Sequence, residues 1–534
     1  MRRPNAPLQQ RTGRVSAPIS SSNNRKLKNA QSSQIKILIA ILISTALLVG
    51  YGAYQVVYSG ATTPPASNSR GTNGVRGVSG AIDSLPMKKV VEKDSIPSAI
   101  RKEKSAATST KKYSHNFPEP PPTDQDGTRY HVIFSTSCSG LTHWQSFLFF
   151  YQAMKVQQIG NVTRIASSCS DEEKQREKEW HETHIQSQMS DRFKIHFTPH
   201  FMSVKNEDGT DSNKDYKFFN KPFGLEHWME HGEGMGLDPV TGKMVDEDVV
   251  VILLDPDMAF LRPITADFSE EENFIISGPV KNHESKRVEH GYPYAQLYAF
   301  GAQPFRRIDI ATFAGKDSPA LLATAEEQKR NYPVGPPYIA TSRDMYAIAT
   351  KWTEFVPSVH KQYPELLAEM FAFSIAAAHV KLPHTIVDSL MISNPGGREG
   401  DAFIHNIPDG EVCETAYHLN EYDGPLPNVI HFCQRYIIGD WLFAKHRPHL
   451  KEFFSCDSPL LKDPPMDLEK TLYAGVPEKI GEKKTLTAKN AKMNAFMVCG
   501  IHAAMNEAGE FFKKNHCEGK GEKTLQLYHT IAAK

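Results

Sequence analysis

Two aspartates one residue apart, Asp255 and Asp257, come directly after the apolar run Val249–Leu254. Such a run predicts a strand covered on both faces, and ligands of open α/β sheets bind just outside the carboxyl ends of the strands. Paired carboxylates at that edge suit a hard divalent cation that takes its remaining ligands from substrate phosphates. The sequence therefore predicts a metal-held nucleotide here. The alternative is a simple Asp-Pro turn.

Later residues could complete such a site. Glu369 lies among apolar residues of a predicted helix over 365–379 with a buried stripe, and a carboxylate there is costly unless it is paired, liganded or functional. His431, on a short predicted strand over 429–433, could join a metal, although a lone histidine on a strand is more often structural. A basic and aromatic cluster that could neutralise a diphosphate follows. Its members are Arg435, Tyr436, Trp441, Lys445, His446 and Arg447.

Strands that alternate with helices must position these residues. Strands are predicted over 130–135, 162–167 and 274–277, and the first of them ends in the small polar cluster Ser135-Thr136-Ser137. Helices are predicted over 144–156, over 171–182 as a solvated helix, and from Pro222, with Leu225, Trp228 and Met229 on one face. Residues 334–339 read as a rigid loop entering an extended segment. The alternation predicts an α/β fold with a mostly parallel sheet.

The amino-terminal part predicts a membrane anchor. Residues 37–58 contain no charged side chain and, as a helix, would span about 33 Å, enough for a bilayer core of about 30 Å. Residues 1–36 carry Arg and Lys but no acid, which predicts a basic cytosolic tail and a lumenal carboxyl terminus. A cleaved signal peptide is the alternative. Residues 59–128 are rich in Ser, Thr, Pro, Gly and Lys, which predicts a disordered stem.

The overall composition excludes few classes of binding partner. The 61 basic and 61 acidic residues give a formal net charge of zero, so nothing global indicates nucleic acid binding. The 7 cysteines all follow the predicted stem in no CxxC pattern, which favours disulfides over a zinc site and leaves an odd cysteine. The partners cannot be assigned from sequence. The sequon Asn161-Val162-Thr163 matters only if it is lumenal and exposed.

These blocks, in this order, resemble the plant and algal peptidyl serine α-galactosyltransferases and hydroxyproline O-arabinosyltransferases. The resemblance runs from about Tyr130 to His449 and is carried by six ordered blocks. They are His131–Ser135 with His143-Trp144-Gln145, Asn161–Arg164, Asn220 through Trp228, Val250–Met258 with Pro263, Glu369-Met370 with Phe371 and Phe373, and His431 with Gly439, Trp441, Phe443 and Lys445.

The resemblance implies a GT-A-like nucleotide-sugar-binding domain over 129–455 and leaves 456–534 as an extension of unknown role. It implies that Asp255, Asp257 and His431 hold Mn²⁺ or Mg²⁺ on the donor diphosphate. Asp257 and Glu369 are the implied catalytic residues, with Glu369 as the nucleophilic or acceptor-side carboxylate. The implied donor-binding residues are Ser135, Thr136 and Ser137, which would cradle uridine, together with Lys221 and Lys445.

The resemblance further implies a single-pass Golgi or ER membrane enzyme with a lumenal catalytic domain. Its reaction would move galactose or arabinofuranose from UDP-galactose or UDP-arabinofuranose to serine or hydroxyproline hydroxyls of secreted proteins, with retention of configuration. Two other functions stay open. One is metal-dependent phosphoryl or nucleotidyl transfer, disfavoured because no GxxxxGK[ST] loop is present. The other is a non-catalytic GT-A-fold module that binds glycans or proline-rich peptides.

This sequence departs from the family pattern in two places. Asp255-Pro256-Asp257-Met258 mixes the Asp-Ala-Asp-Met of the galactosyl branch with the Glu-Pro-Asp-His of the arabinosyl branch, so the sugar is undecided. Leu366 stands where both branches carry Trp, and Phe371 and Phe373 replace tyrosines. The lost hydroxyls could change donor or acceptor choice.

Overall fold

The computed structural model describes residues 117–138, 142–205, 211–277, 286–393, 400–519 and 530–531. They belong to one compact unit, Ala106–Lys534. The cytosolic tail, the membrane helix and most of the stem that we expected fall outside the described residues. Within the described ranges, no helix combines the length and the apolar composition needed to cross a bilayer.

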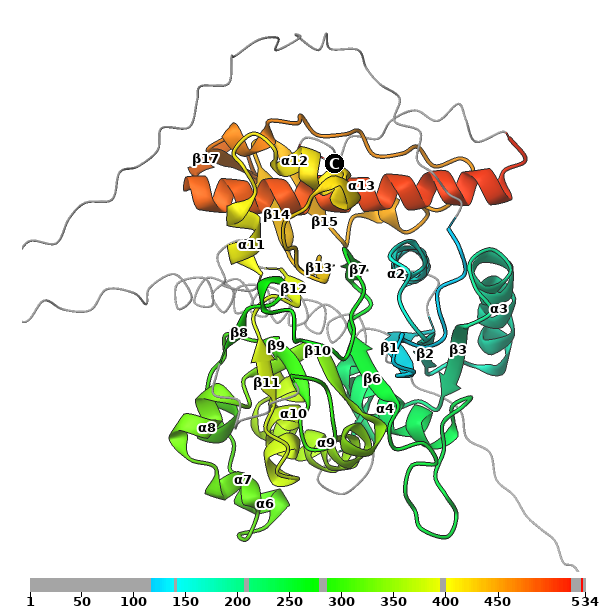
Figure 1. The fold of residues 1–534 in the computed structure, drawn as a ribbon, viewed down its shortest axis with the longest axis vertical. Coiled ribbons are helices and arrows are strands. Elements are labelled where there is room, and N and C mark those ends of the chain that lie inside the picture. The colour runs from blue at the N-terminus through cyan, green and yellow to red at the C-terminus, as the bar shows by residue number, and fades with distance from the viewer. Residues whose placement is uncertain are drawn as a thin grey trace, which may run out of the picture. The chain divides into compact units, whose positions relative to one another are not determined.

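An eight-stranded mixed sheet with the strand order β3-β2-β1-β6-β10-β9-β11-β8 forms the centre of this unit (Figure 1). Its strands are β1 (Tyr130–Ser137), β2 (Asn161–Ser167), β3 (Phe193–Thr198), β6 (Val250–Leu254), β8 (Ile276–Ser277), β9 (Tyr294–Leu297), β10 (Val334–Thr341) and β11 (Thr385–Val387). Strand β1 pairs in parallel with β2 and β6, β2 with β3, and β9 with β11. Strands β10 and β8 run antiparallel to their neighbours. The predicted parallel-rich α/β sheet is confirmed.

Two strands differ from the sequence prediction. Residues 334–339, expected as a loop entering an extended segment, are extended throughout and form most of the fully buried strand β10, which pairs with β6 and β9. Its Pro336-Pro337 pair falls where the register with β9 shifts, between Gly335 and Tyr338. Proline cannot donate to a ladder and is tolerated at such a bulge, which explains how a proline-rich segment enters a central strand. The strand expected over 274–277 is only the two-residue β8.

Helices cover both faces of the sheet. The longer helices are α2 (His143–Lys155), α3 (Asp171–His181), α4 (Asn220–His231), α9 (Ser342–Gln362), α10 (Ala368–His379) and α13 (Ala488–His516), and the shorter ones are α5 (Gln303–Arg307), α6 (Ala311–Ala314), α7 (Pro319–Leu322), α8 (Ala325–Arg330), α11 (Asp401–Asn406) and α12 (Val412–Tyr417). Side chains of a strand alternate between the two faces of a sheet. Accordingly, Ile252 and Leu254 join a hydrophobic cluster with α2 and α13, whereas Val251 and Leu253 join one with α4, α9 and α10.

Two helices are buried differently from the sequence prediction. Helix α10 begins at Ala368 and is buried on all sides as far as Ala378, because it lies against α9 and the sheet rather than at the surface. Leu366, expected on its buried stripe, lies before the helix and is 61% exposed. Helix α3, expected to be solvated, buries Glu177 and His181 against the neighbouring strands.

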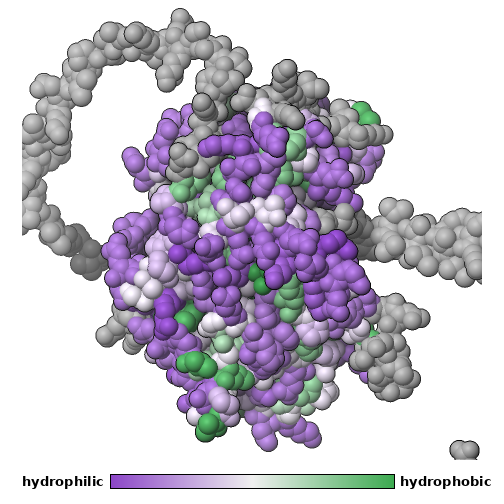
Figure 2. Space-filling view, turned by 90° about the vertical axis from the view of Figure 1, so that its right-hand side faces the viewer, coloured by the Kyte–Doolittle hydropathy of each residue, from purple (hydrophilic) through white to green (hydrophobic). Residues whose placement is uncertain are grey.

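The carboxyl-terminal part packs into the same core. Helix α13 contacts α12, α2 and the hairpin of β14 (Arg435–Ile438) and β15 (Trp441–Ala444), as Figure 1 shows. A second hairpin joins β16 (Tyr473–Val476) to β17 (Lys479–Thr485). The face drawn in Figure 2 is mostly hydrophilic, and its hydrophobic residues lie in separate small groups. Residues 456–534 therefore contain a long helix that shares one hydrophobic cluster with the strands before it.

The expected disulfides are present. Cys138 pairs with Cys169, Cys413 with Cys499 and Cys456 with Cys517, and Cys433 is the free cysteine. The last two bridges tie α13 to α12 and to the segment before β16. The sequon lies in strand β2, inside the sheet. Asn161 Nδ2 lies 3.0 Å from His131 Nε2, and Val162 and Thr163 are buried, so the sequon is not an exposed loop.

Candidate active site

The predicted carboxylate edge lies where a second, smaller sheet meets the first. Strand β6 ends at Leu254, the segment 255–257 follows, and β7 (Met258–Phe260) continues into a three-stranded sheet with β13 (Val429–His431) and β12 (Met391–Ile392). His431 pairs with Met258 across the antiparallel β13–β7 ladder. Residues about 170 positions apart in sequence thus come together because the chain passes from one sheet into the other.

Asp255, Asp257 and His431 form one cluster of possible metal ligands. His431 Nε2 lies 3.2 Å from Asp257 Oδ1 and 3.8 Å from Asp255 Oδ2. One ligand atom from each residue lies within 4.8 Å of the others. Hard cations bind oxygen at about 2.0–2.6 Å, so opposite ligands of one ion are about 4–5 Å apart. Two carboxylates and one imidazole therefore fit a divalent ion such as Mn²⁺ in spacing and in donor chemistry.

Lys445 extends the cluster on the side of Asp257. It follows β15, and its Nζ forms an ion pair with Asp257 Oδ2. Burial opposes the charge of Asp257, but His431 and Lys445 outweigh that effect and hold the pKa of this carboxyl well below its usual range. Asp257 therefore stays ionised. Arg435, from the same predicted basic cluster, points elsewhere and pairs with Glu478.

Lys221 extends the cluster on the side of Asp255. It lies in the first turn of α4, and its Nζ is 2.8 Å from both Asp255 Oδ1 and Glu369 Oε1. Burial opposes a charge on this lysine, but the two carboxylates outweigh that effect and raise the pKa of Lys221. The lysine, whose contact could not be derived from sequence, is thus the bridge between the metal cluster and Glu369.

Glu369 is buried in the first turn of α10 and is 4% exposed. Trp352 Nε1 donates to its carbonyl oxygen at 2.7 Å, and its amide donates to the Tyr216 hydroxyl at 3.4 Å, which fixes the backbone. Burial raises the pKa of the carboxyl, and Lys221 works against that rise. Its Oε2 has no hydrogen-bond partner among the described residues. The buried carboxylate is therefore paired, which is one of the three alternatives that the sequence left open, and a role in binding or catalysis stays a prediction.

Two residues around His431 were missed by sequence reasoning. Met391 Sδ lies 3.2 Å from His431 Nδ1, on the side of the ring away from the aspartates. Cys433 lies beside the same histidine, and its Sγ is 3.3 Å from Ser393 Oγ. Burial opposes ionisation of Cys433, but His431 outweighs it and lowers the pKa of the thiol. The only signal in the sequence was that Cys433 is two residues from His431.

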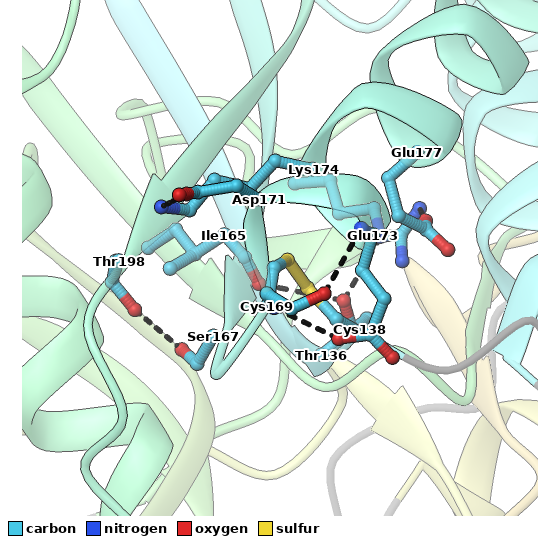
Figure 3. The surroundings of a disulfide bond; sticks show 12 residues. Thr136, Cys138, Ile165, Ser167, Cys169, Asp171, Glu173, Lys174, Glu177 and Thr198 are labelled. Atoms are coloured by element: carbon cyan, nitrogen blue, oxygen red, sulfur yellow. Dashed lines mark hydrogen bonds and ion pairs between the residues drawn. A yellow bond between two sulfur atoms is a disulfide. The ribbon is translucent and has the colours of Figure 1, made fainter.

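The polar cluster Ser135-Thr136-Ser137 is the end of β1 and not a loop. Ser135 Oγ donates to the carbonyl of Asn220 at 3.3 Å, next to the helix turn that carries Lys221. Thr136 points to the opposite face. There its hydroxyl accepts from Arg164 Nε at 2.9 Å. Figure 3 shows Thr136 in the surroundings of the Cys138–Cys169 bridge. The structure thus brings Ser135 close to the carboxylate cluster and turns the side chain of Thr136 away from it.

Arg164 and Glu177 form a buried ion pair that sequence reasoning did not find. Arg164 is fully buried, and its Nη1 lies 2.8 Å from Glu177 Oε2. His143 Nε2 lies 2.9 Å from the other carboxylate oxygen of Glu177 and stacks on Trp180. Arg164 and His143 stood in matched blocks without a role. Their partner Glu177 was read as one acid among many on a solvated helix.

Phe371 and Phe373 do not reach the site. Phe371 stacks on Tyr363, and Phe373 stacks on Tyr338 with ring centroids 3.8 Å apart. Both phenylalanines are fully buried. Their stacking partners, Tyr363 and Tyr338, are not residues of the candidate site, and the expected effect of the missing hydroxyls on donor or acceptor choice stays a prediction.

Comparison with known proteins agrees with the motifs. The peptidyl serine alpha-galactosyltransferase of Arabidopsis thaliana is 23% identical to this chain over 360 residues, which cover 66% of this chain and 36% of that protein. The resemblance expected from the six blocks is confirmed. This chain spans only about a third of that relative's length.

Other comparisons add less. An apo structure of the WbbM bifunctional glycosyltransferase matches with a TM-score of 0.28 and 9% identity, over 59% of this chain and 47% of that one. A likeness at this level carries no argument about the fold. No protein-family model matches the chain.

Proposed function

We propose that this protein is a metal-dependent glycosyltransferase of the GT-A type. It would transfer galactose or arabinofuranose from a UDP-sugar to serine or hydroxyproline hydroxyls of secreted proteins, with retention of configuration. The observation that carries the proposal is the continuous cluster of alternating charge Lys445–Asp257–His431–Asp255–Lys221–Glu369, built from residues far apart in sequence. The similarity to the Arabidopsis galactosyltransferase supports the reaction class.

The cluster has two ends that suit the two parts of a sugar nucleotide. Lys445 lies at the end with Asp257, where its ammonium can donate to the oxygens of a diphosphate. A divalent cation held by Asp255, Asp257 and His431 would offset the negative charge that grows on the leaving diphosphate. We place the diphosphate at this end, because the ammonium of Lys445 and a cation held by Asp255, Asp257 and His431 would both lie there.

The other end suits the sugar. Glu369 is held by Lys221, and its buried Oε2 has no hydrogen-bond partner in the described part of the chain. We propose that this oxygen accepts a hydrogen bond from a sugar or acceptor hydroxyl, or acts as the nucleophile. Burial raises the pKa of this carboxyl, and the ammonium of Lys221 works against that rise. A search for a covalent intermediate on Glu369 would separate its two proposed roles, nucleophile and acceptor-side carboxylate.

The proposed location is a Golgi or ER membrane, with residues 37–58 as the anchor and the catalytic part in the lumen. The charge asymmetry on the two sides of that apolar segment supports this orientation. The three disulfides also suit an oxidising compartment.

One experiment tests the proposal directly. The purified full-length protein is incubated with Mn²⁺, a panel of UDP-sugars and a peptide that contains serine and hydroxyproline. The mass of the peptide is then measured by mass spectrometry. A gain of one hexose or one pentose is expected, and it identifies the sugar. Release of a nucleoside monophosphate would favour nucleotidyl transfer. Peptide binding that needs neither nucleotide nor metal, with no mass gain, would favour a non-catalytic module.

A further inference from the structure

A group of three histidines lies outside the candidate active site. His196 comes from β3, the edge strand of the large sheet, and His227 and His231 lie one turn apart on α4. His196 Nε2 is 2.9 Å from His227 Nδ1, and the rings of His227 and His231 have centroids 4.6 Å apart. His196 is opposite Ile165 in the β2–β3 register and so faces α4.

The histidine group packs against aromatic side chains, and two ion pairs lie beside it. The ring of Phe201 packs against His227 and stacks on Phe223. The carboxylate of Glu230 is 3.7 Å from His231 Nε2. Lys194, also on β3, is occupied by Glu233 at 3.3 Å. His196 and His227 therefore contact each other directly, and the carboxylate of Glu230 lies on the side of His231.

His196 and His227 are held as neutral bases. Burial, and after it His227 and His231, lower the pKa of His196 to about 4, and burial also lowers the pKa of His227. Neutral imidazole is the form that binds metals. Zn²⁺ binds nitrogen at about 2.0–2.1 Å with tetrahedral angles, so two of its nitrogen ligands are about 3.3 Å apart. The 2.9 Å between His196 and His227 is a few tenths of an ångström from that spacing.

We propose that His196, His227 and His231 bind a borderline transition-metal ion, of which Zn²⁺ is the representative. His196 and His227 supply the converged pair. His231, 59% exposed at its side chain, completes the set by a change of rotamer, which is fast for an exposed side chain. A histidine pair one helical turn apart is a known way for a helix to present two ligands to zinc.

The site has a structural consequence. An ion held there cross-links the edge strand β3 to the carboxyl-terminal half of α4, and the first turn of the same helix carries Lys221. The metal would thus fix the helix that bridges Asp255 and Glu369. This site stands independently of the proposed function, since it uses none of the residues of the carboxylate cluster.

The test measures Zn²⁺ alone on the full-length protein. The variant His431→Asn weakens the first cluster and serves as the background, so that the remaining zinc binding reports the histidine group. Isothermal titration is expected to give one equivalent of Zn²⁺ in this background. Adding His227→Gln should remove that binding, and adding His231→Gln should weaken it at least tenfold. The matched control is His200→Gln, an exposed histidine just after β3, which should leave it unchanged.

A second measurement needs no substitution. Zn²⁺ should protect His227 and His231 of the unmodified protein from diethyl pyrocarbonate, as followed by peptide mass spectrometry. An unchanged zinc affinity in the His227→Gln or the His231→Gln protein would overturn the proposal, and so would unprotected modification of both residues. The contact between His196 and His227 would then be a hydrogen bond that only stabilises the packing of β3 on α4. None of these results bears on sugar transfer by the carboxylate cluster.

Discussion

The Nζ of Lys221 lies 2.8 Å from Oε1 of Glu369, although 148 residues separate the two in the chain. The same ammonium reaches Asp255 at an equal distance. Lys221 comes from the first turn of α4 and Glu369 from the first turn of α10, two helices on the same face of the sheet. The side chain of Lys221 thus joins the candidate metal cluster to the buried carboxylate of Glu369. A change of charge at Asp255 would therefore be felt at Glu369, and the reverse.

Replacing Lys221 by methionine should therefore destabilise the protein and abolish transfer. The change leaves Glu369 and Asp255 without their shared cation, and breaking a buried pair by removing one partner costs about 3–5 kcal/mol. Chemical denaturation measures the stability, and peptide mass spectrometry measures the transfer. A loss below about 1 kcal/mol would mean that water, and not the lysine, satisfies these carboxylates.

The double substitution Lys221→Met with Glu369→Gln is the control for that reading. If the lysine acts on Glu369 directly, removing the charge of the glutamate recovers part of the lost stability. A double-mutant cycle should then show a coupling of about 1–3 kcal/mol between the two positions. Additive losses would indicate that Lys221 serves Asp255 alone.

The candidate metal ligands Asp255, Asp257 and His431 could be named from sequence, but the contacts that connect them to other residues could not. Asp255 and Asp257 can be recognised as candidate ligands because they directly follow the apolar run of a buried strand. Lys221, by contrast, sits on a polar helix start with no pattern that points to a partner. Its role depends on how α4 and α10 cross the sheet, which is set by tertiary packing. The contact of Met391 with His431 depends likewise on the pairing of β12 with β13.

The fold shows the same division. Alternation of apolar runs was enough to predict β1, β2, β6, α2 and α4. It failed at β10, because Gly335-Pro336-Pro337 has the composition of a loop, and only the bulge against β9 lets it lie in a sheet. It also failed for Leu366. Periodicity alone assigned that residue to a buried stripe, but the helix starts two residues later, at Ala368.

Asp257→Asn should abolish metal binding at the cluster while it keeps the side-chain volume. The carboxylate is both a ligand and the charge partner of His431 and Lys445, so its loss should raise the Kd for Mn²⁺ by more than the roughly 10- to 100-fold typical of outer-shell changes. Isothermal titration measures this. Asp344→Asn is the matched control, because Asp344 is an equally buried aspartate that pairs with Arg343 on α9, and Mn²⁺ affinity should not change there.

Lys445→Met should weaken UDP binding by about 10- to 100-fold, the effect of losing a hydrogen bond of about 1.5–3 kcal/mol to a charged group. Lys445→Arg should retain most of the binding because it keeps the charge. An exposed lysine nearby offers a control, since Lys451→Met should have little effect. Equal UDP affinities in the wild type and the Lys445→Met protein would remove Lys445 from the diphosphate end.

The stability of this protein should fall as the pH drops below about 6.5, and His384 is one cause. The residue is buried against Phe373, and burial lowers the pKa of its imidazole to about 3 from 6.5. The unfolded chain therefore binds a proton between these two values and the folded protein does not. Stability from this group is complete above pH 6.5 and is lost by about 1 kcal/mol per pH unit below it. His384→Phe should flatten the decline measured by denaturation between pH 7 and pH 5, whereas His200→Gln, at an exposed position, should not. A slope that is the same in all three proteins would show that His384 is accessible to protons in the folded state.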